Sequence, residues 1–243
     1  MACLILVLLA VLSATYATTE IEKRVIGGSN VVSGNYAYVG SLQQFLDGAW
    51  THICGVTRRA SSLFVSAGHC TNGSDASTFR VVFDTVDLTD LSPPAQITSI
   101  SSIYVIGSFT QNGPGYRLDY TELTVLNSNI TAHGAQDIIL SNLTALNLTG
   151  QQCIIVGFGE GSVLMEKSVT VISTAECIQR LSGSGAMITE TEEICIDGHS
   201  ITAGDSGAPL VCGGEYVGLA SWSYTPCPGT SVFLRLSSPI LDD

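Results

Sequence analysis

Short runs rich in valine, isoleucine and threonine recur along the chain, separated by glycine, serine, asparagine and proline. β-Branched residues favour extended strands, and glycine or proline between them is typical of turns. A helical pattern is expected over 174–181, and it is short. This succession predicts an all-β barrel or sandwich, with strands expected at 37–45, 63–66, 80–83, 97–106, 154–158, 168–172, 209–212, 216–222 and 231–236.

Composition narrows the class of protein. The 243 residues suffice for one domain with a well-filled core. Charged residues make up only 12% and apolar residues 45%, which argues against a disordered chain. The formal net charge of −12 argues against nucleic acid and anionic membranes as partners, because phosphate binding needs clustered lysine and arginine. We expect a monomer.

The N-terminal residues predict export. An apolar run over 3–12 is too short to span a bilayer, and small residues follow it as far as Ala17. We interpret 1–17 as a signal peptide that directs the protein to an oxidising, extracellular space. A polar stretch, 18–24, then ends in Lys23 and Arg24 before an apolar run. This dibasic pair predicts an activation propeptide that is removed by a cut after Arg24.

Cysteines and glycosylation sequons fit a secreted chain. Eight cysteines are present, and loss of Cys3 with the signal peptide leaves seven, an odd number. Their pairing cannot be deduced from the count alone. Asn-x-Ser/Thr sequons mark expected glycosylation at Asn72, Asn129, Asn142 and Asn147.

Two short motifs offer a nucleophile and a base. Ser206 lies between Gly204-Asp205 and Gly207, where the backbone can turn tightly and substrate can approach amide N–H groups. His69 follows the strand-like run 63–66 in the motif Ser-Ala-Gly-His-Cys. Three other histidines, His52, His133 and His199, are available as alternative bases.

Three motifs in order carry a family resemblance. Val-Ile-Gly-Gly from Val25, Ser-Ala-Gly-His-Cys around His69, and Gly-Asp-Ser-Gly-Ala-Pro around Ser206 resemble the trypsin/chymotrypsin family of secreted serine peptidases. The resemblance extends from Val25 nearly to the C-terminus, so 25–243 is expected to be the peptidase domain. It implies two six-stranded antiparallel Greek-key β-barrels with the active site in the cleft between them.

The resemblance assigns catalytic roles to three residues. Ser206 is expected to be the nucleophile, His69 the general base and Asp119 the acid that orients the imidazole. Asp119 precedes an alternating run in which Thr121, Leu123 and Val125 share one face, whereas a different alignment places Tyr120 at the acid position. We prefer Asp119 because a triad without a carboxylate loses about four orders of magnitude in turnover.

The same resemblance predicts an oxyanion hole and an activation switch. The backbone N–H groups of Gly204 and Ser206 would bind the oxyanion. A cut after Arg24, made by a trypsin-like protease, would free the α-amino group of Val25 to form a buried ion pair with Asp205.

The substrate pocket is expected at Ser200, six residues before Ser206, and at the segment Ser221, Trp222 and Ser223. A neutral serine cannot balance a buried lysine or arginine side chain. We therefore expect cleavage after aromatic or large aliphatic residues first, and after smaller apolar ones second. The segment from Ser221 is expected to pair with the substrate backbone as an added strand.

The resemblance also implies the bridges Cys54–Cys70, Cys153–Cys212 and Cys177–Cys195. A fourth bridge that the family usually has would start at Thr202, so Cys227 is expected to lack its partner. Ala208 stands where the family usually has a second glycine after the nucleophile. No metal or cofactor is expected, since the spacing of Asp84, Asp87 and Asp90 matches no rigid calcium cage.

Two functions remain open. The first is a stand-alone, chymotrypsin-like endopeptidase made as a zymogen, whose partners are protein or peptide substrates, a trypsin-like activator and protein inhibitors. Few tryptic sites remain, because removing Lys23 and Arg24 from nine basic residues leaves seven, which hints at a digestive role. The alternative is a catalytically silent homologue that acts as a binding or regulatory module.

Overall fold

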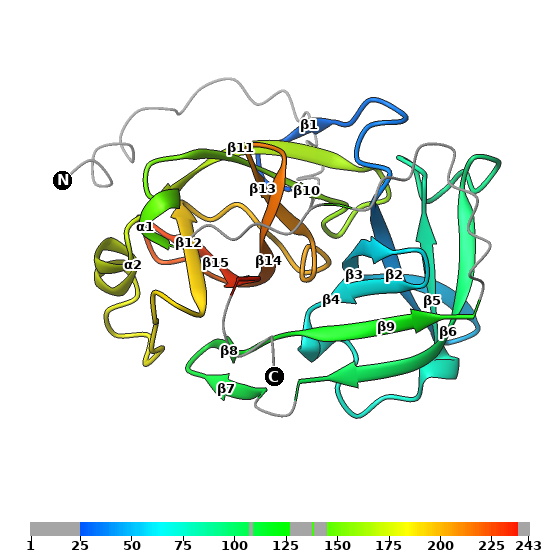
Figure 1. Ribbon diagram of the computed structural model, residues 1–243, viewed down its shortest axis with the longest axis horizontal. Coiled ribbons are helices and arrows are strands. Elements are labelled where there is room, and N and C mark those ends of the chain that lie inside the picture. The colour runs from blue at the N-terminus through cyan, green and yellow to red at the C-terminus, as the bar shows by residue number, and fades with distance from the viewer. Residues whose placement is uncertain (1–24, 107–108, 127–137, 139–144, 238–243) are drawn as a thin grey trace, which may run out of the picture.

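The computed structural model describes residues 25–106, 109–126, 138 and 145–237. This part of the chain forms two closed rings of antiparallel strands, which Figure 1 shows beside each other. The predicted pair of six-stranded barrels is therefore confirmed. The predicted signal peptide and propeptide, with Arg24, lie outside the described residues.

The first barrel closes in the order β2-β3-β4-β9-β6-β5. Its inward face follows the alternation expected of a half-buried strand. In β9, Thr121, Leu123 and Val125 are buried while Glu122 and Thr124 lie on the other face. The strands are β2 (Val39–Leu46), β3 (Ala49–Ala60), β4 (Leu63–Ser66), β5 (Phe79–Phe83), β6 (Gln96–Val105) and β9 (Thr121–Val125).

The second barrel has the strand order β11-β10-β13-β14-β15-β12, and pairing of β12 with β11 closes it. The short strand β1 (Ser29–Asn30) adds to β11 from outside the ring. Its strands are β10 (Gln152–Gly157), β11 (Met165–Ile172), β12 (Glu193–Asp197), β13 (Pro209–Cys212), β14 (Glu215–Tyr224) and β15 (Thr230–Arg235).

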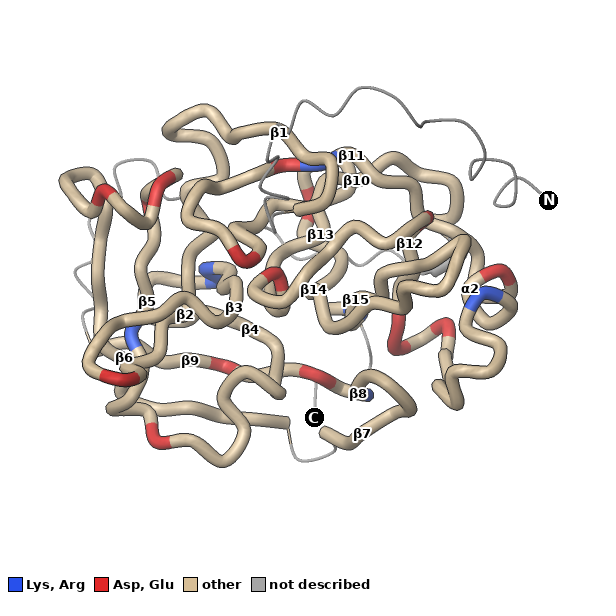
Figure 2. Tube along the Cα trace, turned by 180° about the vertical axis from the view of Figure 1, so that it is seen from behind, with Lys and Arg blue, Asp and Glu red and all other residues tan. Residues whose placement is uncertain are grey.

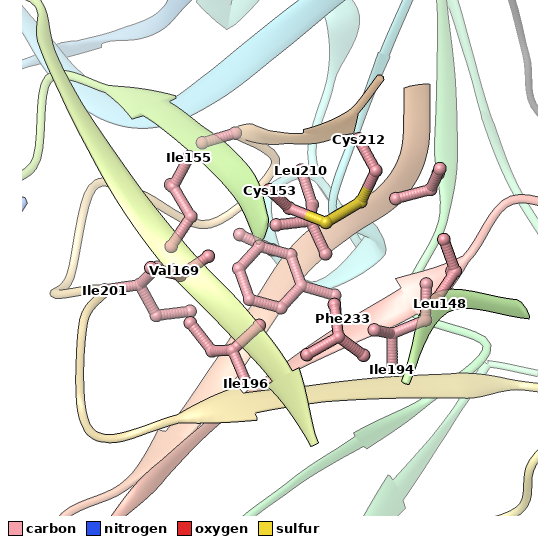
Figure 3. Close-up of a cluster of buried hydrophobic side chains, with 14 residues drawn as sticks. Leu148, Cys153, Ile155, Val169, Ile194, Ile196, Ile201, Leu210, Cys212 and Phe233 are labelled. Atoms are coloured by element: carbon pink, nitrogen blue, oxygen red, sulfur yellow. A yellow bond between two sulfur atoms is a disulfide. The ribbon is translucent and has the colours of Figure 1, made fainter. Parts of the chain in front are cut away.

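Each barrel has an apolar core. Phe64, Phe79 and Phe83 fill the first barrel. Phe233 lies at the centre of the second core, beside the Cys153–Cys212 bridge, as Figure 3 shows. Burying aromatic side chains of this size contributes about 2 to 3 kcal/mol each, so both rings are packed units rather than open channels.

Few helices accompany the strands. Helix α2 (Thr174–Arg180) confirms the helix predicted over 174–181, and the Ser173 hydroxyl caps it by accepting a hydrogen bond from Glu176 N. The other elements are α1 (Ala145–Leu148), 3₁₀ helices at Gly68–Cys70 and Ala76–Thr78, and a hairpin of β7 (Thr110–Asn112) and β8 (Gly115–Arg117). No helix in the described ranges is both long and apolar enough to cross a bilayer.

The three predicted disulfides are all present: Cys54–Cys70, Cys153–Cys212 and Cys177–Cys195. The expectation that Cys227 has no partner is wrong, because Cys227 is disulfide-bonded and no described cysteine is free. Disulfides fit an oxidising, extracellular compartment.

Acidic residues outnumber basic ones, as Figure 2 shows along the Cα trace. The few arginines are largely engaged. Arg117 binds Glu192 through Nε and Nη2 of its guanidinium, and Arg180 pairs with Glu176 and Asp197.

Candidate active site

Three turns carry the predicted catalytic residues. His69 lies in the 3₁₀ helix Gly68–Cys70 just after β4, and Asp119 lies two residues before β9. Strands β4 and β9 pair, with Ser66 opposite Thr121, which brings His69 and Asp119 together. Ser206 comes from the second barrel, in the turn before β13.

The Asp119 carboxylate holds His69 by two hydrogen bonds. The backbone N–H of His69 donates to Oδ1 at 2.8 Å, and the ring Nδ1 lies 2.7 Å from Oδ2. The carboxylate is buried and also accepts a bond of 2.5 Å from Ser221 Oγ. Because a carboxylate only accepts, Nδ1 carries the ring proton and Nε2 is left as an acceptor. Tyr120 instead bonds Arg59 and Glu122 through its hydroxyl.

An aromatic ring covers one face of His69. Tyr116, in β8, stacks on the imidazole with centroids 4.7 Å apart and planes 14° apart. The hairpin that carries it is fastened to the second barrel by the Asn112 amide on the Met187 backbone and by Arg117 on Glu192. Sequence analysis missed this contact, since nothing in a three-residue strand identifies a stacking partner.

The turn around Ser206 depends on glycine. Gly204 has φ +91°, and a Cβ there would overlap the carbonyl oxygen of Gly159. Gly207 has φ +85°, and a Cβ there would overlap the carbonyl oxygen of Gly55. Gly55 N in turn donates to the Ser206 carbonyl at 2.7 Å, so this turn is fixed against the first barrel.

Ser206 and Ser221 line the same cleft, and Ser221 bonds Asp119, so the cleft adjoins the acid–base pair. Within the described residues no hydrogen bond joins the Ser206 hydroxyl to the His69 ring. Such contacts are often long before substrate binds and tighten in the complex.

The Asp205 carboxylate is buried beneath the turn. Oδ1 accepts from Gly159 N at 2.8 Å, and Oδ2 accepts from the amide and hydroxyl of Thr202. Burial raises the pKa of Asp205 to about 6, against the effect of these bonds. Val25 is buried too, and Ile26 N donates to the Ser200 carbonyl. In the uncut chain Val25 N is an amide, so no ammonium group is available there for Asp205.

The raised pKa of Asp205 makes the uncut chain less stable as the carboxyl ionises. Its pKa rises from an ordinary 3.8 to about 6, so its contribution to stability is fully present below about pH 4 and is lost as pH rises through 6. The Asp205→Asn variant lacks this dependence. Its free energy of unfolding relative to the parent is expected to rise by about 2 kcal/mol between pH 4 and 7. Denaturant unfolding at several pH values measures the difference, and a flat difference would contradict it.

His52 supports the same turn and was not predicted to do so. Its Nε2 lies 3.2 Å from the Gly204 carbonyl oxygen, and its Nδ1 lies 2.6 Å from Ser41 Oγ. Since a carbonyl only accepts, Nε2 carries the proton and Nδ1 accepts from Ser41. Burial lowers the pKa of His52 to about 4, which keeps it neutral. The His52 ring thereby fixes the position of the Gly204 carbonyl group.

Replacing His52 by phenylalanine is expected to lower kcat about tenfold with little change in KM. The ring keeps its edge contact with Phe158 but no longer holds the Gly204 carbonyl, so the Gly204 N–H loses alignment. Steady-state kinetics measures both constants, and Ser41→Ala, which spares the Gly204 bond, is the matched control. A raised KM with unchanged kcat would show loss of ground-state binding instead.

The cleft beside Ser206 has a volume of about 270 Å³. Ser200, expected at its base, is buried beneath this lining and accepts a bond from Lys167. Beyond Ala220, no described strand pairs with β14 on the side opposite β15. The lining residues are His199, Ile201, Thr202, Ala203, Ser206, Ser221, Trp222, Ser223 and Thr225.

Other predicted sites fall outside this region. The sequons at Asn72 and Asn147 are exposed, while Asn129 and Asn142 lie outside the described residues. The carboxylates of Asp87 and Asp90 accept bonds from residues two positions further along the chain, which is typical of turns. A ring nitrogen of His69 and the sulfurs of Cys54 and Cys70 lie within 4.8 Å of one another, but the sulfurs form a disulfide and so provide no thiolate ligand.

Ala208 fits its position without displacing the turn. It is fully buried, and it lies against Gly55 and Gly157, which have no side chains. A Cβ on Gly55 would come within 2.9 Å of Ala208 N. The glycines on the two facing strands thus leave room for the extra methyl group of Ala208.

Comparisons with known proteins agree with this geometry. The trypsin family matches residues 25–240. A chymotrypsin-like serine proteinase of Haliotis rufescens is 32% identical, covering 98% of this chain and 97% of that protein. Fibrinolytic enzyme isozyme C of Lumbricus rubellus is 29% identical, covering 88% and 96%.

A solved structure supports the fold. Neuropsin, a serine protease expressed in the limbic system of mouse brain, superposes with a TM-score of 0.73 at 23% identity, covering 87% of this chain and 94% of that one. The family match over residues 25–240 shows the family of this chain, and so does the relative that is 32% identical over 97% of its length. This chain belongs to the trypsin family of serine peptidases.

Proposed function

We propose that the protein is a secreted serine endopeptidase that is made as a zymogen. The observation that carries the proposal is the pair of hydrogen bonds from His69 to the buried Asp119, beside a cleft that contains Ser206. This arrangement leaves an acceptor nitrogen on an oriented imidazole, which is what a hydroxyl nucleophile requires.

In the proposed reaction, Ser206 Oγ attacks the scissile carbonyl while His69 Nε2 takes the hydroxyl proton. Asp119 holds the tautomer and stabilises the imidazolium that forms. The N–H groups of Gly204 and Ser206 bind the oxyanion, each lowering the barrier by about 3 kcal/mol. His69 then protonates the leaving amine, and water hydrolyses the acyl-enzyme by the same steps in reverse order.

The proposed activation step is a cut after Arg24 by a trypsin-like protease. The free ammonium of Val25 would then neutralise Asp205, whose carboxylate is buried and has a raised pKa in the uncut chain. Val25 is already buried in the uncut chain, and its neighbour Ile26 already donates a hydrogen bond to the Ser200 carbonyl. An ion pair at this position would hold the turn that carries Gly204 and Ser206.

The proposed specificity is for an apolar residue before the scissile bond, aromatic or large aliphatic first and smaller apolar second. Ile201, Ala203 and Trp222 give the cleft apolar walls. The unpaired side of β14 beyond Ala220 would pair with the substrate backbone. The Haliotis relative is named chymotrypsin-like, which agrees with this choice. A digestive role fits the scarcity of tryptic sites.

One experiment tests the proposal. The chain is cut after Arg24, treated with a fluorophosphonate probe, and profiled on a peptide library with and without the probe. We expect the label on Ser206 and probe-sensitive cleavage after apolar residues. Cleavage chiefly after lysine or arginine would contradict the specificity, and neither labelling nor cleavage would indicate a catalytically silent homologue.

A further inference from the structure

Lys167 is a partly buried cation beneath the substrate cleft. It is the only lysine among the described residues, and it lies on β11. Its ammonium donates to Ser200 Oγ at 2.9 Å, and burial lowers its pKa. Throughout the described ranges no carboxylate lies within ion-pair distance of it. The charge of Lys167 is therefore expected to act on a substrate side chain that enters the cleft.

Hydroxyl groups connect Lys167 to the cleft wall. Ser200 N donates to Ser231 Oγ at 3.0 Å, and Ser223 Oγ lies 2.9 Å from the same oxygen. Ser223 lines the cleft, and so does Ile201, which follows Ser200 in the chain. The sequence of contacts from cleft to cation is thus Ser223, Ser231, Ser200 and Lys167.

Nearby carboxylates do not offset this charge. Asp197, three residues before Ser200, pairs with Arg180. The oxygens of Asp205 accept hydrogen bonds from Gly159 and Thr202, and after activation this carboxylate would pair with the Val25 ammonium. None of these carboxylates pairs with Lys167, whose ammonium lies one hydrogen bond from Ser200.

We propose that Lys167 sets the charge selectivity of the cleft, by repelling basic side chains of the substrate and favouring acidic over isosteric neutral ones. The proposal rests on the proposed peptidase function and specifies its substrate class. It goes beyond the neutrality of Ser200, because a neutral base only fails to attract lysine, whereas a cation beneath it repels lysine. Discrimination of this kind needs a repulsive element as well as attractive contacts.

Four peptides that differ only in the residue before the cut provide the measurement: methionine against lysine, and glutamine against glutamate. Each pair has nearly the same shape and differs in charge. For the activated parent protein we expect kcat/KM for lysine to be at least about 100-fold below that for methionine. We expect glutamate to be cleaved at least as well as glutamine.

Two variants isolate the charge. Lys167→Met keeps the length and apolar stem of the side chain, and Lys167→Arg keeps the charge. In Lys167→Met the lysine-to-methionine ratio of kcat/KM is expected to rise about tenfold, and the glutamate-to-glutamine ratio to fall about tenfold. Lys167→Arg is expected to keep both ratios near those of the parent.

The outcomes separate this proposal from the peptidase function. An equal loss on all four peptides would mean that Lys167 only supports the fold of the Ser200 loop, and unchanged ratios in Lys167→Met would also overturn the proposal. If that variant does not fold, the two ratios measured for the parent decide alone, and cleavage after lysine as fast as after methionine overturns the proposal. Labelled Ser206 with unchanged ratios refutes the charge role only, whereas absence of labelling and cleavage refutes both.

Discussion

Replacing Ser206 by alanine is expected to lower kcat about a million-fold with KM nearly unchanged. The change removes the proposed nucleophile, the hydroxyl oxygen that would bond to substrate, while the turn fixed by Gly55 and Gly207 needs no hydroxyl. Cleavage of a fluorogenic apolar peptide by the activated protein measures the loss, and thermal melting checks that the fold is kept.

Ser223→Ala is the matched control, since it removes a hydroxyl from the same cleft. It is expected to keep the fluorophosphonate label and to change kcat far less than Ser206→Ala. If Ser206→Ala retained more than about one part in a thousand of the activity, the nucleophile would have to be another residue.

Replacing Asp119 by asparagine is expected to lower kcat about ten-thousand-fold. The amide oxygen can still accept the His69 backbone N–H, which places the amide NH₂ against Nδ1. Nδ1 must then accept, so the proton moves to Nε2, which can no longer take the proton of Ser206. The ring is held in place in the wrong tautomer, and KM is expected to change little.

Tyr120→Phe is the comparison that tests the alignment of the acid. Its hydroxyl bonds only Arg59 and Glu122, so its removal is expected to leave kcat within about twofold. Steady-state kinetics of both variants measures the contrast. A large loss of kcat in Tyr120→Phe, together with a small loss in Asp119→Asn, would favour the alternative alignment, which places Tyr120 at the acid position.

The strands could be predicted from the sequence where apolar and polar residues alternate or where a run of residues is fully apolar. β4 and β13 match their predicted ranges, and β9 shows the alternation that selected Asp119. β3 was not predicted, because it spans Ala49–Ala60 and includes Cys54, Gly55 and two arginines, which hide any simple period. Strand ends also shifted by one to three residues, since pairing rather than local propensity ends a strand.

The residues of the candidate site could be predicted only where they belong to short sequence motifs. His69 and Ser206 stand in recognisable sequences, and the three bridges followed from the family resemblance. The roles of His52 and Lys167 depend on contacts with Gly204 and Ser200, which lie 152 and 33 residues away in the chain. No local pattern carries such information, because these contacts form only when segments that are far apart in the chain fold against each other.

The hairpin of β7 and β8 belongs to neither barrel sheet, yet it spans the boundary between the barrels. Tyr116 stacks on His69, Gly115 packs so closely on Trp222 that a Cβ would overlap the indole, and Arg117 grips Glu192. The proposed acid and base come from one barrel and the proposed nucleophile from the other, so neither core alone keeps them in line. The hairpin acts as a clasp, together with the bonds from Ser221 to Asp119 and from His52 to Gly204, and sliding of one barrel past the other would first have to undo these contacts.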